Sequence, residues 1–81
     1  MRHEYLKYRG MKNELQARAM ELRLEGKGLV LLLRDVLEPF QPDLTKLRLE
    51  EAMAWLKRLR EIQLELLDIN MRIRELEEHL G

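Results

Sequence analysis

The amino-acid sequence predicts an all-α fold: an antiparallel two-helix hairpin, coiled-coil-like, formed by residues 1–81 as a single domain. Charged residues make up 37% of the chain, and only four glycines and two prolines interrupt it. This composition is typical of long helices and coiled coils, and 81 residues are enough for one small domain. Apolar residues recur at alternating spacings of three and four, which is the pattern of helices that pack along one stripe.

The first helix is expected over residues 3–38. Its apolar stripe repeats every seven residues, which is the period of a coiled-coil seam, at Tyr8, Leu15, Leu22, Leu29 and Val36. Other residues fill the same seam early in the helix, at Met11, and later, at Ala19, Gly26, Leu33 and Phe40.

Two glycines, Gly26 and Gly28, weaken this expectation, because each costs about 1 kcal/mol relative to alanine inside a helix. A break at residues 25–28, which would give three helices, is the alternative. The hairpin supplies a reason for one continuous helix. Folding the chain about residue 41 places residues 26–28 opposite residues 54–56, where a missing side chain leaves room for the indole of Trp55.

A loop is expected over residues 39–43, because Pro39 and Pro42 both lack the N–H that a helix needs. Asp43 can accept a hydrogen bond from the free N–H groups of a new helix, with Thr45 as an alternative cap. The second helix is therefore expected over residues 44–80. Since the two arms are nearly equal in length, they are expected to fold back on one another.

The second helix has the more regular seam. Nine positions alternate spacings of three and four without a miss, at Ala52, Trp55, Leu59, Ile62, Leu66, Ile69, Ile73, Leu76 and Leu80. Charge placement supports an antiparallel arrangement. Residues 1–12 carry four basic side chains and one acidic one, whereas residues 61–81 carry six acidic and two basic ones. A hairpin places these two oppositely charged segments side by side.

Both helices carry a second apolar stripe, roughly opposite the seam. It is expected to form a homodimer interface, through which two hairpins make a four-helix bundle, and comprises Met20, Leu24, Leu31, Leu64, Leu67 and Met71. The alternative occupant of this face is a helix of another protein.

Catalysis is not expected, because the chain has no serine and no cysteine and matches no phosphate-binding loop. His3, His79 and Glu75 would lie at one end of the hairpin, where a two-histidine, one-carboxylate metal site is conceivable. We expect His3 and His79 instead to be surface histidines that bind no metal. No metal, cofactor or small-molecule substrate is therefore assigned.

A basic cluster on the second helix, comprising Lys57, Arg58 and Arg60, provides candidate phosphate contacts. Acidic residues are interleaved with it, and the formal net charge of the chain is zero, whereas nucleic-acid binders normally carry a basic excess. A small regulator that binds nucleic acid through this cluster is thus the alternative function.

The chain has no apolar leader or membrane-spanning stretch, and its longest apolar run has five residues, 29–33. We expect a cytoplasmic protein that is not an enzyme. Its expected function is protein–protein interaction, as a self-assembling structural or adaptor element.

Overall fold

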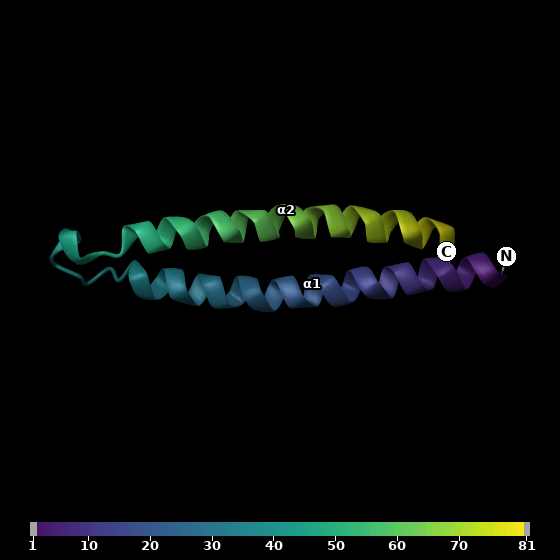
Figure 1. Ribbon diagram of the computed structural model, residues 1–81, viewed down its shortest axis with the longest axis horizontal. Helices are drawn as coiled ribbons and strands as arrows, with labels where there is room; N and C mark the ends of the chain where they lie inside the picture. Colours follow the sequence, from purple (N-terminus) through teal and green to yellow (C-terminus); the bar gives the residue numbers. More distant parts are fainter. Residues whose placement is uncertain (1, 81) are drawn as a thin grey trace.

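The computed structural model describes residues 2–80 as two long helices joined by a compact turn. Helix α1 spans Arg2–Val36, a short 3-10 helix η1 spans Leu44–Lys46, and helix α2 spans Leu49–Leu80. The two long helices lie side by side and antiparallel, so that both ends of the chain meet at one end of the hairpin (Figure 1). The molecule is a rod of 64 × 16 × 15 Å. The predicted all-α two-helix hairpin is therefore confirmed.

Helix α1 runs without a break through Gly26 and Gly28, so the three-helix alternative is wrong. The expected pairing of these glycines with the indole of Trp55 is also wrong. Gly26 is buried, and a Cβ atom built on it would lie 3.6 Å from Leu59 Cδ1 and 3.8 Å from Ile62 Cγ2. The absent side chain therefore faces the middle of the α2 seam.

The turn between the helices is longer than residues 39–43. Helix α1 ends at Val36, and α2 begins at Leu49 instead of residue 44. Asp43 does cap a helix, but this helix is η1: its Oδ1 atom accepts hydrogen bonds from the Thr45 amide at 3.0 Å and the Thr45 hydroxyl at 2.6 Å. Helix η1 ends after one turn because Leu47 has an extended backbone, with φ −70° and ψ 134°.

Two positions assigned to the α1 seam are exposed instead of buried. Phe40 belongs to the turn and is 87% exposed, because α1 has already ended. Met11 is 42% exposed, and the neighbouring Lys12 is half-buried instead, with its Nζ atom 3.1 Å from Oε1 of Glu77. This ion pair joins the basic start of α1 to the acidic end of α2, as the charge distribution predicts.

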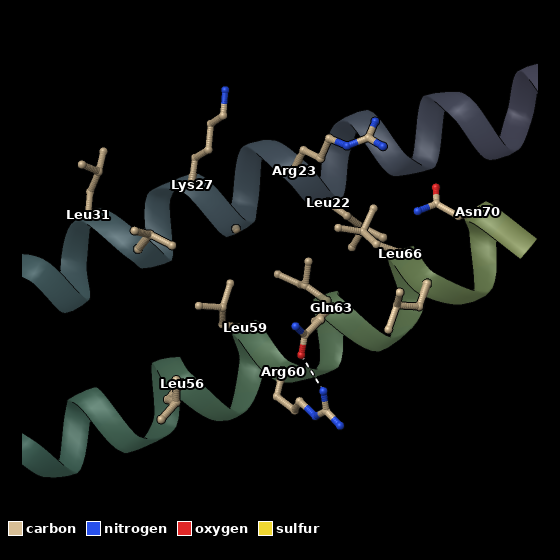
Figure 2. Close-up of a pocket in the computed structure, with 14 residues that line it drawn as sticks. Leu22, Arg23, Lys27, Leu31, Leu56, Leu59, Arg60, Gln63, Leu66 and Asn70 are labelled. Carbon is tan, nitrogen blue, oxygen red and sulfur yellow. Dashed lines mark hydrogen bonds between the residues drawn. The ribbon is translucent and has the colours of Figure 1, made fainter.

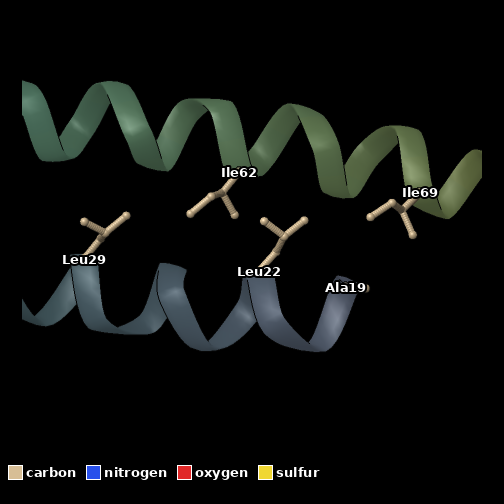
Figure 3. Packing of buried hydrophobic residues seen from close by; sticks show 5 residues of the cluster. All are labelled: Ala19, Leu22, Leu29, Ile62 and Ile69. Atoms are coloured by element: carbon tan, nitrogen blue, oxygen red, sulfur yellow. The ribbon is translucent and has the colours of Figure 1, made fainter. Parts of the chain in front are cut away.

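The core is a single row of interlocking side chains between the two helices. Its centre comprises Ala19, Leu22, Leu29, Ile62 and Ile69, whose side chains point toward one another across the interface (Figure 3). Leu15, Trp55, Leu59, Leu66 and Ile73 are partly buried and pack against this centre. All nine predicted seam positions of α2 are buried or half-buried, which confirms that seam.

Candidate interaction surface

One face of the hairpin carries an open groove between α1 and α2, with a cavity volume of about 1080 Å³ (Figure 2). Residues of the seam form its floor, namely Leu22, Leu59, Ile62 and Leu66. Exposed apolar side chains from both helices form its walls, namely Val30, Leu31, Leu56 and Leu67. The seam is therefore covered only partly on this face, and the groove presents a continuous apolar surface.

The charged side chains along the groove are all basic. Arg23 and Lys27 stand on α1, and Arg60 stands on α2. Arg60 Nη1 donates a hydrogen bond to Gln63 Oε1 at 2.5 Å, which the dashed line in Figure 2 marks. None of the residues that line the groove is an aspartate or a glutamate. A chain of zero net charge thus places three basic side chains beside this exposed apolar surface.

The other face of the hairpin is bridged by ion pairs. Arg58 donates two hydrogen bonds to Glu25, from Nε to Oε2 at 2.6 Å and from Nη2 to Oε1 at 2.8 Å. Arg18 donates from Nε to Oε2 of Glu65 at 2.7 Å. Helix geometry places residues 18 and 25 on the side of the α1 seam away from Arg23. The two faces of the hairpin therefore differ in chemistry.

These bridging pairs shift the pKa values of their acids. Hydrogen bonding by Arg58 lowers the pKa of Glu25 below its ordinary value, and hydrogen bonding by Arg18 does the same for the pKa of Glu65. In both pairs the ionised carboxylate is the form that receives the hydrogen bonds. The pKa of each arginine is raised in turn. Both pairs are ionised at neutral pH.

The six residues predicted to form a dimer interface are all exposed, by 50% to 69% of their surface. Leu31 and Leu67 lie in the walls of the groove. Met20, Leu24, Leu64 and Met71 lie outside the groove, on the outer sides of the helices. The dimer interface itself stays a prediction.

The three basic residues of the predicted phosphate site do not converge on one surface. Arg58 is half-buried and its guanidinium is engaged by Glu25. Arg60 lines the groove, whereas Lys57 is exposed and does not line it. Arg58 and Arg60 lie on opposite faces of the hairpin, so their arrangement does not favour phosphate binding. Nucleic-acid recognition stays a prediction.

The end of the hairpin near the termini holds a contact that sequence reasoning missed. The rings of Tyr8 and His79 stack with centroids 4.8 Å apart and planes 17° apart, beside a smaller cavity of about 530 Å³. An antiparallel hairpin places both residues at the same height, so the sequence contained the information needed to predict this contact. The basic character of the groove was missed too, because Arg60 is far from Arg23 and Lys27 in sequence.

Comparison of the chain with protein-family models, curated proteins and solved structures finds no match. Neither helix, over residues 2–80, has a stretch long and apolar enough to cross a membrane. Within the same range, no three histidine, cysteine, aspartate or glutamate side chains are grouped so that they could hold a metal ion. The groove is therefore the feature from which a function can be argued.

Proposed function

We propose that this chain is a non-enzymatic assembly element, which acts by protein–protein interaction and pairs with a second copy to form a four-helix bundle. The groove between α1 and α2 is the observation that carries the proposal. It leaves two seam residues, Leu59 and Leu66, only half-buried, whereas a four-helix bundle covers such residues with the helices of a neighbour.

The balance of buried and exposed apolar residues supports the same proposal. Among the described residues, eight apolar residues are buried, whereas seventeen large apolar side chains are exposed. A two-helix rod buries one stripe of each helix and is small for an independent domain. Contiguous apolar surface of this kind marks interaction sites in proteins. Cyclic dimers are the commonest closed assemblies, so a second copy is the proposed partner.

The proposal is tested by light scattering behind size exclusion over a wide range of concentrations, with circular dichroism on the same peak. A helical dimer is expected. The Leu24→Glu/Leu67→Glu variant is expected to give helical monomers or an unfolded chain. Milder Leu31→Ala and Leu67→Ala variants keep the helix propensity and are expected to weaken the dimer without unfolding it.

The matched control places two new carboxylates on exposed apolar residues of the turn, in the Phe40→Glu/Leu44→Glu variant. It should dimerise like the unaltered chain. A dimer that the Leu24→Glu/Leu67→Glu variant leaves unchanged contradicts the interface assignment. A chain that stays monomeric and folded at every concentration overturns self-association and directs the search to a helix of another protein.

A cytoplasmic location stays a prediction of the sequence.

A further inference from the structure

The basic side chains of the groove stand on both of its edges. Arg23 and Lys27 lie about one turn apart on the α1 edge, and Arg60 lies on the α2 edge (Figure 2). The Cβ position of Gly26 contacts Leu59, so the residues that follow them in the chain, Lys27 and Arg60, lie at similar heights of the hairpin. A molecule that fills the groove therefore has positive charge on both sides of its apolar contact.

These three basic side chains are not neutralised within the hairpin. The salt bridges made by residues 2–80 include none of Arg23, Lys27 and Arg60, and Arg60 donates its hydrogen bond to the uncharged amide of Gln63. On the opposite face, each arginine that reaches across to the other helix is paired with a glutamate. The chain thus supplies acids to the basic residues that bridge one face and none to those of the groove.

The shape of the groove suits a helix. Its floor is recessed between α1 and α2, with Leu22 and Ile62 buried and Leu59 and Leu66 half-buried. Its α2 edge spans residues 56–70, which is about 21 Å at 1.5 Å per residue, or about four helical turns. A flat bilayer surface would reach the walls of the groove but not this floor, whereas the apolar stripe of an amphipathic helix can fill both.

A second copy covers the apolar surface of the groove but brings no acid to its edges. No aspartate or glutamate lines the groove. When groove packs on groove about a two-fold axis parallel to the helices, α1 of one copy lies over α2 of the other, so Lys27 and Arg60 come together. A two-fold axis perpendicular to the helices sets α1 on α1 and brings the two basic α1 edges together. Like charges that meet across an interface disfavour both arrangements.

We infer that the groove takes a second kind of occupant: an amphipathic helix of another protein, with acidic residues on both sides of its apolar stripe. This helix competes with the second copy for the groove. Its apolar residues, at spacings of three and four, fill the floor, and its acids face Arg23 and Lys27 along one edge and Arg60 along the other. Charges that flank an apolar stripe select partners in this way. The inference goes beyond self-association and does not depend on it, because the groove and its charges belong to the single hairpin.

Two synthetic peptides test the inference. Each is about five helical turns long with leucines at spacings of three and four, and the flanking positions carry glutamate in one peptide and lysine in the other. In fluorescence anisotropy at low salt, the hairpin should bind the glutamate peptide at least about tenfold more tightly than the lysine peptide, and added salt should reduce this preference. Sedimentation velocity should show the dimer replaced by complexes of one hairpin with one peptide.

Charge reversal in the groove should reverse the preference. The Arg23→Glu/Lys27→Glu/Arg60→Glu variant is expected to bind the lysine peptide at least about tenfold more tightly than the glutamate peptide. Binding of the lysine peptide also shows that this variant is folded.

The matched control makes the same change of net charge at exposed residues that do not line the groove, in the Lys7→Glu/Lys46→Glu/Lys57→Glu variant. It should bind the glutamate peptide within about threefold of the unaltered chain.

Three results overturn the inference. The hairpin binds both peptides alike or binds neither; the glutamate peptide binds without dissociating the dimer; or vesicles that contain phosphatidylserine bind where the glutamate peptide does not, which assigns the face to a membrane surface. Each of them leaves the proposed self-association standing. A chain that is monomeric without peptide but prefers the glutamate peptide overturns self-association and supports the assignment of the groove.

Discussion

Arg58 on α2 and Glu25 on α1 form a two-pronged ion pair across the hairpin, with donor–acceptor distances of 2.6 and 2.8 Å. Seven residues along each helix, Arg18 and Glu65 repeat the pair with the donor and acceptor helices exchanged. A slip of one helix by seven residues would place arginine against arginine or glutamate against glutamate. The two pairs thus specify the register, which the apolar seam alone specifies less strictly because its leucines and isoleucines are similar.

The first prediction concerns acid. The pKa values of Glu25 and Glu65 are lowered in the folded protein from an ordinary value of 4.5, chiefly by the hydrogen bonds of Arg58 and Arg18. A lowered pKa means that the stabilisation is present above pH 4.5 and is lost as the pH falls through the folded-state values. Urea denaturation should therefore show a less stable hairpin at pH 3 than at pH 7.

The Glu25→Gln/Glu65→Gln variant should lose part of this pH dependence, because its side chains no longer titrate. Glu50→Gln/Glu78→Gln removes two exposed acids that have no cross-helix salt bridge among the described residues, and it serves as the control. Equal pH dependence in the two variants would show that the bridging pairs do not contribute to stability.

The sequence predicts the seams because burial along one stripe is periodic and needs no knowledge of the loop. Ala52, Ile62 and Ile69 are buried in the positions that the spacing assigns. The start of α2 was not predictable in the same way. Asp43 is a good cap for either kind of helix, and the extended conformation of Leu47, which ends η1, has no signature in the residue type.

Because the loop was predicted too short, the predicted register of the two helices was also wrong, and the groove could not be predicted. Folding about residue 41 aligned Gly26 with Trp55, whereas the longer turn brings it level with Leu59 and Ile62. The groove depends on this register, because Arg23 and Arg60 share a surface only when the helices are correctly aligned. Helix wheels of the separate arms could identify apolar stripes but could not place charges from both arms on one face.

The second prediction concerns the glycines of α1. Gly26→Ala places a methyl group in ordinary van der Waals contact with Leu59 and Ile62, at 3.6 and 3.8 Å, and Gly28→Ala meets nothing within 4 Å. Alanine is favoured over glycine inside a helix by about 1 kcal/mol, so each variant should raise the free energy of unfolding by up to that amount. Chemical denaturation below the concentration of self-association measures it. A loss of stability in Gly26→Ala would mean that the helices approach more closely than the structure shows.

The third prediction concerns the core. Leu22 and Ile62 are the largest fully buried side chains of the described residues, at 0% and 2% exposure. Truncation of either to alanine should lower the free energy of unfolding by about 2 to 5 kcal/mol, which can unfold so small a protein. Phe40→Ala removes a larger side chain from an exposed position in the turn and should change stability by no more than about 0.5 kcal/mol. Similar losses at Phe40 and Leu22 would contradict the assignment of the seam as the only apolar core within the described residues.

The fourth prediction concerns the turn. The pKa of Asp43 is lowered from its ordinary value of 3.8, chiefly by the hydrogen bond from the Thr45 hydroxyl and then by that from the Thr45 amide. The ionised carboxylate therefore stabilises the turn above pH 3.8, and this stabilisation is lost as the pH falls through the lowered pKa. Asp43→Ala removes the acceptor for both bonds and should lower the thermal midpoint. Asp43→Asn retains an acceptor oxygen, so it should keep more of the stability at pH 7 and lose the acid sensitivity of the Thr45 amide signal in NMR spectra. If alanine and asparagine behave alike at pH 7, an acceptor oxygen at residue 43 does not stabilise η1, and the other hydrogen bonds of the turn, such as that from the Asp43 amide to Gln41 Oε1, hold it instead.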